Sequence, residues 1–441
     1  MKKRVISVLL AAAMVMSLLA GCGNSSNETT DDATTEDTGS EDAGEQVTLT
    51  YWGWDSNYYQ PMIDAYMESH PNVTIEATAV EWGDMLTKAQ QALASGSDLP
   101  TIIPMDITLI ANWKEMGILE NLSDYGLDTG NYAPALIEAA TNTDGEVIGL
   151  FENICPAGIA YKRDLALEYF GTDDPEELQA MFSSYEDYVK KGKEVSEKSG
   201  GSTYLFHSGQ AVAEWLYFAS DITNVTDSTI NMTEKMTDVM GKLVDLRDAG
   251  AVDTYQNGTA EANATYADDS HIFYPCPDWA LTYYIESNDP EGSGNWGLLK
   301  APVSYSHGGT AMGISNTASD AEKEAAYDFI TWCISSEEGA EVARDAAGYI
   351  TQDTSIATTE FSKRSDEEFF GGQDISSLYY QEIISEISIA TPSVFDNDIV
   401  STRNDVAQQL MNDPKMTLDD AVTAAVQELS KLVTDTGVTI K

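Results

Sequence analysis

Residues 47–52 read Val-Thr-Leu-Thr-Tyr-Trp, and this alternation of apolar and polar side chains predicts a half-buried β-strand. A helical stripe of apolar residues follows over 58–69, and a second alternating strand covers 73–77. Another helix, ending before Gly96, then leads to a third strand over 101–105. Strands separated by helices of this length pair in parallel, so the stretch predicts an α/β domain.

The residues that follow these three strands are aromatic or acidic. Ligands of open α/β sheets bind beyond the carboxyl ends of the strands. We therefore expect five side chains to lie at one ligand-binding rim: Trp54, Asp55, Glu81, Trp82 and Asp106.

The chain of 441 residues carries a formal net charge of -50. A nucleic-acid partner is excluded by this charge, because phosphate binding needs a basic surface. With 42% apolar residues the chain can bury a large core, and its length suggests two domains of ordinary size.

The N-terminus has the pattern of an export signal, with basic residues at positions 2–4 and an apolar run over 5–19. The small pair Ala20-Gly21 stands directly before Cys22, which resembles the lipobox of bacterial lipoproteins. The resemblance implies a signal peptide over 1–21, a lipid on Cys22 and a location on the outer side of the cell membrane. A plain secretion signal beside a chance cysteine is the alternative.

Residues 22–46 are predicted to be an acidic, flexible stalk, because after Cys22 they contain no basic or aromatic side chain. The three later cysteines, Cys155, Cys276 and Cys333, lie far apart and without CxxC spacing. We interpret them as small buried residues; a disulfide between two of them is the alternative. No metal site or cofactor is predicted.

Five stretches, taken in order, resemble the family-1 extracellular solute-binding proteins, which are sugar-binding lipoproteins of ABC importers related to maltose-binding protein. They lie at 49–73, 82–100, 158–164, 277–280 and 308–350. Two positions depart from the family's usual pattern, Thr101 and Asp278, and we expect both at the rim of the site.

The resemblance implies an α/β, two-lobe fold of the periplasmic-binding-protein type II, each lobe a mostly parallel sheet flanked by helices and both joined by a hinge. One lobe would comprise 47–157 and 305–349, and the other 158–304 and 350–441. Crossovers are expected near 155–160, 302–309 and 348–352, with the ligand in the cleft between the lobes.

Sugars need flat aromatic faces for their C–H surfaces and polar groups for their hydroxyls. Trp279 and Trp54 are the predicted stacking residues, and Asp55, Glu81, Asp106 and Glu152 are the predicted hydroxyl acceptors. Gly308 and Gly309 are expected at a hinge or a close approach to ligand. The remaining candidates for the site are Trp82, Trp215 and Tyr349. His271 and His307 are interpreted as structural.

The hypothesis that follows is a monomeric, lipid-anchored receptor that captures a carbohydrate, most plausibly an oligosaccharide, and delivers it to an ABC permease with a separate ATPase. An enzyme is not expected, because GxSxG, HExxH and Walker A motifs are absent from the sequence. Two alternatives stay open: the same fold with a non-sugar solute such as a polyamine, and a surface glycosidase.

Overall fold

A computed structural model describes residues 45–357, 367–434 and 436–441. The predicted signal peptide, the lipid site at Cys22 and the stalk up to residue 44 lie outside the described residues. Among the helices that are described, none has both the length and the apolar character needed to cross a membrane.

The first α/β unit has the element order that the sequence predicts: β1 (Val47–Gly53), α1 (Ser56–Ser69), β2 (Val73–Ala79), α2 (Met85–Ser95) and β3 (Ile102–Asp106). Strand β1 pairs in parallel with both β2 and β3. The predicted stripe of α1 is buried against this sheet, and Gly96 ends α2 with a positive φ of 67°. The unit is therefore confirmed element by element.

Two long strands, β4 (Leu150–Lys162) and β9 (Trp296–Ile314), connect this unit with the rest of the chain. They pair antiparallel at the centre of a seven-stranded sheet of order β2-β1-β3-β9-β4-β8-β5, in which β8 is His271–Pro277 and β5 is Tyr204–Phe206. The parallel pairs flank this centre, β2-β1-β3 on one side and β8-β5 on the other. The register of β4 and β9 shifts between Ala157 and Gly158, in the region where crossovers are predicted.

The buried side chains form separate clusters in two parts of the chain. The first part, here called the β1 half, draws its clusters from 49–154 and 311–347. The second, the β8 half, draws them from 157–305 and 370–433. Each half is thus discontinuous in sequence, as the predicted lobes are; the proposed lobe boundaries themselves stay a prediction.

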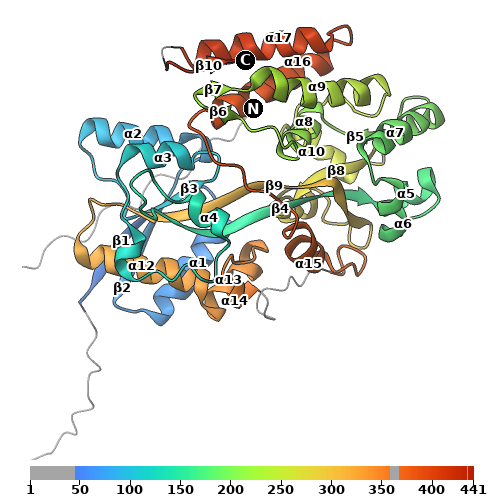
Figure 1. The fold of residues 1–441 in the computed structure, drawn as a ribbon. Coiled ribbons are helices and arrows are strands. Elements are labelled where there is room, and N and C mark those ends of the chain that lie inside the picture. The colour runs from blue at the N-terminus through green and yellow to red at the C-terminus, as the bar shows by residue number, and fades with distance from the viewer. Residues whose placement is uncertain (1–44, 358–366, 435) are drawn as a thin grey trace, which may run out of the picture. The chain divides into compact units, whose positions relative to one another are not determined.

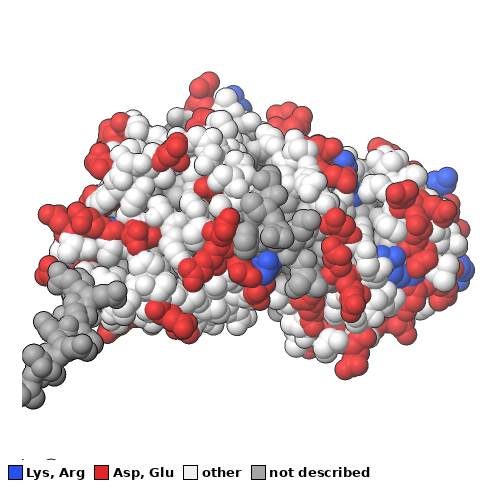
Figure 2. Space-filling view, turned by 90° about the horizontal axis from the view of Figure 1, so that it is seen from below, with Lys and Arg blue, Asp and Glu red and all other residues white. Residues whose placement is uncertain are grey.

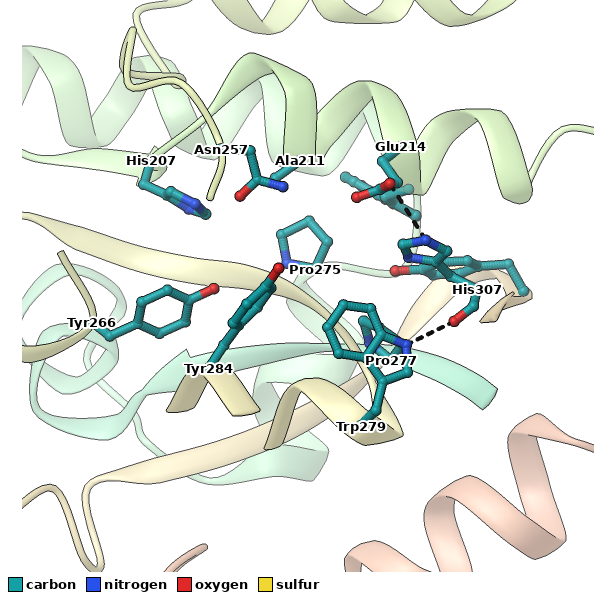
Figure 3. A pocket seen from close by; sticks show the side chains of 12 residues that line it. His207, Ala211, Glu214, Asn257, Tyr266, Pro275, Pro277, Trp279, Tyr284 and His307 are labelled. Atoms are coloured by element: carbon teal, nitrogen blue, oxygen red, sulfur yellow. Dashed lines mark hydrogen bonds and ion pairs between the residues drawn. The ribbon is translucent and has the colours of Figure 1, made fainter. Parts of the chain in front are cut away.

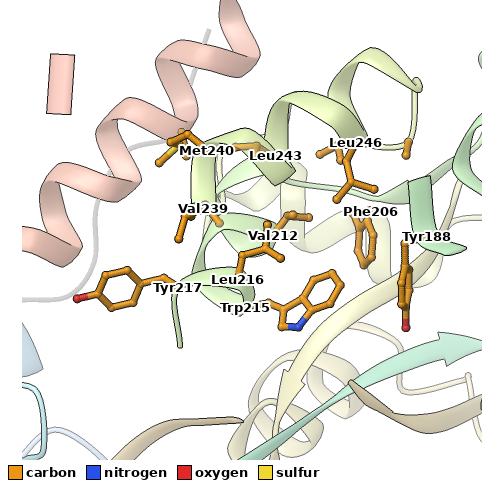
Figure 4. Close-up of a cluster of buried hydrophobic side chains, with 14 of the residues drawn as sticks. Tyr188, Phe206, Val212, Trp215, Leu216, Tyr217, Val239, Met240, Leu243 and Leu246 are labelled. Carbon is orange, nitrogen blue, oxygen red and sulfur yellow. The ribbon is translucent and has the colours of Figure 1, made fainter. Parts of the chain in front are cut away.

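Helices cover both faces of the β1 half, with α2 and α3 on one face and α1, α12 and α13 on the other (Figure 1). In the β8 half, α8 and α9 enclose an apolar cluster that contains Trp215 (Figure 4). The helices not yet given are α3 (Ile110–Met116), α4 (Pro134–Ala139), α5 (Arg163–Phe170), α6 (Pro175–Met181), α7 (Tyr185–Ser199), α8 (Gly209–Phe218), α9 (Met232–Asp248), α10 (Ala260–Ala264), α11 (Asp278–Ala280), α12 (Asp320–Ser335), α13 (Glu337–Ala347), α14 (Thr354–Ala357), α15 (Ile375–Ser377), α16 (Asp396–Asn412) and α17 (Leu418–Leu432).

Shorter elements complete the described chain. They are the helical turns η1 (Trp82–Asp84), η2 (Leu122–Tyr125), η3 (Thr265–Ala267), η4 (Leu281–Glu286) and η6 (Leu378–Ile383), and a small sheet of β6 (Val225–Thr226), β7 (Thr229–Ile230) and β10 (Thr439–Ile440).

Candidate ligand-binding site

A hollow opens in the β8 half between α8 on one side and β8, α11 and η4 on the other (Figure 3). We call it the Trp279 pocket. Glu214 and Asn257 reach into it from the α8 side, and Trp279 and Tyr284 from the opposite side. Its lining residues are His207, Ala211, Glu214, Trp215, Asn257, Tyr266, Pro275, Pro277, Trp279, Tyr284, Tyr305 and His307.

The Trp279 indole is half-buried and held at its edge. Its Nε1 donates a hydrogen bond of 2.9 Å to the carbonyl oxygen of His307, and the Tyr284 ring meets it edge-on at 5.3 Å. Gly308 comes so close that a Cβ there would lie 3.3 Å from this nitrogen, and its φ of +105° also favours glycine. Because the polar edge is already satisfied, the ring offers apolar surface to the pocket.

Glu214 lies between two nitrogen groups. Its Oε1 is 3.4 Å from His307 Nε2 and accepts a hydrogen bond of 3.2 Å from Arg403 Nη2. Burial lowers the pKa of His307 and of Arg403, whereas the nearby Glu214 raises both. The Glu214 carboxylate therefore has a cationic partner behind it, while its own side chain lines the pocket.

A second hollow lies in the β1 half where β1, α1, β4 and the end of α13 meet. We call it the Glu152 pocket. It brings together four predicted site residues with a group of tyrosines, and its lining is Tyr51, Gly53, Trp54, Asp55, Tyr58, Tyr59, Pro104, Glu152, Thr310 and Tyr349.

Asp55 caps α1 and also connects the two halves. Its Oδ1 accepts the backbone N–H of Tyr58 at 3.3 Å. The hydroxyl of Tyr283 donates to its two oxygens at 2.6 and 2.7 Å, and the hydroxyl of Tyr349 donates at 3.2 Å. Tyr283 belongs to η4, directly after Trp279, so Asp55 ties the β1 half to the segment that carries the stacking candidate.

Glu152 is the most deeply placed of the predicted carboxylates, with 7% of its surface exposed. Burial raises its pKa to about 8; the charge of Asp55 acts in the same direction and the hydroxyl of Tyr58 in the opposite one. Within the described part of the chain its Oε2 has no hydrogen-bond partner. A protonated carboxyl with one unused oxygen is thus left facing the hollow.

Asp106 is half-buried beside β9. Its Oδ1 accepts the backbone N–H of Thr108 at 2.7 Å, and Gly309, whose φ is +145°, accepts from the N–H of Ile107 at 2.9 Å. Burial raises the pKa of Asp106, while Thr108, His307 and Trp82 act in the opposite direction. Ile107, Thr108 and Gly308 also border a third and larger hollow.

For three further predicted site residues the structure gives less support, and their role in binding stays a prediction. Glu81 and Trp82 are exposed at the start of η1 and line none of these three hollows. Trp215 is only 2% exposed and packs edge-on against Tyr188 at 5.3 Å, so it belongs mainly to the core although it borders the Trp279 pocket.

The two departures from the family pattern are not rim residues, and that expectation is wrong. Thr101 is buried at 4% exposure and exchanges hydrogen bonds with Thr50 across β1 and β3. Asp278 is buried at 1% exposure, accepts from the hydroxyl of Tyr380 and from the N–H of Trp279, and so fixes the turn that presents the indole.

Sequence reasoning missed Glu214, Asn257, Tyr266 and Tyr284. Glu214 stands one position before Trp215 in the sequence, and only the tryptophan was expected at the site. The aromatic run over 271–285 signalled tyrosines near Trp279 but not which of them faces the pocket.

The cysteines and histidines do not form a metal centre: among the described residues there is no group of three or more potential metal ligands. Cys155, Cys276 and Cys333 are buried thiols. His271 is buried between Asp253 and Asp268, at 3.2 and 3.4 Å, in agreement with a structural role. Acidic side chains outnumber basic ones on the face shown in Figure 2.

Solved structures share this fold. An extracellular solute-binding protein of family 1 aligns with 87% of this chain and 99% of its own at a TM-score of 0.76 and 19% identity. A second solved structure is the galacto-N-biose/lacto-N-biose I-binding protein of the ABC transporter from Bifidobacterium longum, in complex with lacto-N-biose. It aligns with 90% of this chain and 100% of its own at a TM-score of 0.72 and 17% identity. The sugar-binding protein MalE from Xanthomonas citri aligns with 88% of this chain and 98% of its own at a TM-score of 0.71 and 15% identity.

These likenesses show the α/β, two-lobe architecture of MalE-like binding proteins. A sequence profile of the bacterial extracellular solute-binding proteins also matches residues 61–370, more than half of the chain. The chain belongs to the family of bacterial extracellular solute-binding proteins.

Proposed function

We propose that this protein captures a carbohydrate, specifically an oligosaccharide, outside the cytoplasmic membrane and delivers it to an ABC permease. The observation that carries the proposal is the Trp279 pocket, which the Trp279 indole and the Glu214 carboxylate line together. A pyranose ring can stack its apolar C–H face on an indole, and its hydroxyls can donate hydrogen bonds to carboxylate oxygens. This pocket offers a group for each of these two contacts.

The route of the chain supports a hinge mechanism. β4 and β9 run through both halves, and Asp55 and Tyr283 meet between them. A ligand that contacts both halves favours the closed arrangement and shifts the population towards it. The closed surface would then be what the permease recognises.

Anchoring belongs to the same proposal and rests on the sequence. A lipid on Cys22 would hold a monomeric receptor at the membrane, with the acidic stalk as its tether. ATP hydrolysis would fall to a separate ATPase, since the sequence has no phosphate-binding loop. We propose binding without catalysis.

A thermal-shift screen of the purified protein against neutral oligosaccharides, monosaccharides, polyamines and peptides tests the proposal. A ligand that binds only the folded state raises the melting temperature by mass action, and we expect oligosaccharides to do so. Stabilisation by peptides alone would contradict a carbohydrate function. Release of shorter sugars during incubation would favour a glycosidase instead.

A further inference from the structure

The Glu152 pocket differs in kind from a neutral sugar subsite. Two carboxyl groups, Asp55 and Glu152, share it with five aromatic side chains: Tyr51, Trp54, Tyr58, Tyr59 and Tyr349. None of its lining residues is basic. Aromatic faces and carboxylates together are the surroundings that bind an organic cation, because each attracts positive charge.

The two carboxyl groups differ in how many hydrogen bonds they accept. Asp55 already accepts hydrogen bonds from Tyr58, Tyr283 and Tyr349. Glu152 is more than nine-tenths buried, lines the hollow, and its Oε2 has no partner in the described chain. A buried carboxyl oxygen without a hydrogen-bond partner is costly unless a ligand supplies one.

Groups from several elements face Glu152. They are Tyr51 of β1, Asp55 and Tyr58 at the start of α1, Cys155 of β4 itself and Cys333 of α12. All are acidic or neutral, so nothing among them neutralises an ionised Glu152. The positive charge that this site could use must come with the ligand.

We propose that the Glu152 pocket receives a protonated amine of the bound solute, so that the carbohydrate delivered by this protein is an amino sugar or an oligosaccharide containing one. This inference rests on the proposed function and narrows its substrate class. The ammonium donates to Glu152 Oε2 and lies against the tyrosine and tryptophan rings, while the rest of the sugar extends towards Trp279. A neutral hydroxyl would satisfy Oε2 but would leave the aromatic surroundings without a cation.

Protonation of Glu152 provides a signature of the amine. Because burial raises its pKa to about 8, the free protein holds a proton there at pH 7. An ammonium favours the ionised carboxylate, so a ligand that arrives with its amine already protonated releases close to one proton on binding. A sugar amine begins to lose its own proton near neutral pH, so the protons are counted at pH 6, where both the amine and Glu152 are protonated. The apparent affinity rises about tenfold for each pH unit from 5 to 6, since the ionised fraction of Glu152 rises by that factor.

Isothermal titration calorimetry of the protein with matched trisaccharides of glucosamine, N-acetylglucosamine and glucose, and with spermidine, tests the inference. Titrations in two buffers of different ionisation enthalpy count the protons released. We expect glucosamine trisaccharide to bind at least tenfold more tightly than its acetylated and neutral counterparts, with proton release and with weakening by salt. Glu152→Gln should remove both the preference and the proton release, whereas Glu68→Gln, the same change at an exposed position of α1, should keep them.

The outcomes separate the inference from the proposed function. Binding of the neutral or acetylated sugars as tightly as the amine, without proton release, would overturn the inference and support carbohydrate capture. Binding of spermidine alone would support the amine site and overturn the carbohydrate function. A panel in which no amine binds overturns the inference.

Discussion

The Trp279 pocket and the Glu152 pocket each contain a carboxyl group, but the two groups differ in what surrounds them. The partly buried Glu214 of the first has Arg403 behind it at 3.2 Å. No basic residue lines the pocket of Glu152 in the part of the chain that the structure describes, and burial raises the pKa of Glu152 to about 8. A carboxylate with an internal counter-ion can serve a neutral ligand in its ionised form, whereas one without it gains from a cation brought by the ligand.

The largest effect is expected from removing the counter-ion of the Trp279 pocket. Arg403 is fully buried and donates to Glu214 and Asn404, so Arg403→Met leaves Glu214 without its cation. Breaking such a buried pair costs about 3–5 kcal/mol of unfolding free energy. Chemical denaturation measures it, with Lys431→Met on an exposed part of α17 as control. An equal loss in both variants would show that the pair has no special role.

The second prediction concerns pH and the Glu152 pocket. The folded-state pKa of Glu152 lies above the ordinary value of 4.5, so the folded protein binds the extra proton between about pH 4.5 and 8. Its contribution to stability therefore falls as pH rises through that window, by about 3 kcal/mol between pH 5 and 8.

Glu152→Gln removes this titration. We expect the variant to gain stability over the wild type at pH 8 and to gain much less at pH 5, as measured by urea unfolding at both values. A gain of the same size at both pH values would mean that Glu152 titrates normally.

The third prediction tests the stacking face. Trp279→Ala should weaken carbohydrate binding about thirtyfold or more, because a central aromatic contact contributes about 2 kcal/mol or more. The fold should be retained, since the side chain is only half-buried. Trp82→Ala is the matched control: Trp82 is 36% exposed and lines neither pocket, and we expect less than a threefold change. Titration calorimetry distinguishes the two, and a larger loss in Trp82→Ala would move the site to η1.

The smallest effect is expected at the contact that joins the two pockets. Tyr283→Phe removes the hydroxyl that donates to both oxygens of Asp55. A hydrogen bond to a charged group contributes about 1.5–3 kcal/mol at most, and part-exposure reduces that here to about 1 kcal/mol. We expect a more open average form of the ligand-free protein, measured as a larger radius of gyration by small-angle scattering. An unchanged radius would mean that this contact does not bias closure.

Much of the fold could be predicted from the sequence because its signals are local. The alternation over 47–52 and the stop at Gly96 are each set by neighbouring residues, and both are confirmed. Gly308 and Gly309 also have the positive φ angles that only glycine adopts readily.

The site was harder to predict because it depends on contacts between distant segments. Successive helical residues point about 100° apart. An error of that size in the predicted rotation of α8 about its axis would direct Trp215 into the pocket in place of Glu214. The counter-ion Arg403 comes from 189 residues further along the chain, and no local pattern links it to Glu214. Likewise, Thr101 resembled a rim residue until its hydrogen bonds with Thr50 placed it between two strands.

The most direct test of carbohydrate capture is a crystal structure of the protein with the oligosaccharide that stabilises it most. The account predicts a pyranose ring on the face of Trp279, with a hydroxyl bonded to Glu214 and both halves in contact with the ligand. A sugar bound away from Trp279, or one held by a single half, would contradict it.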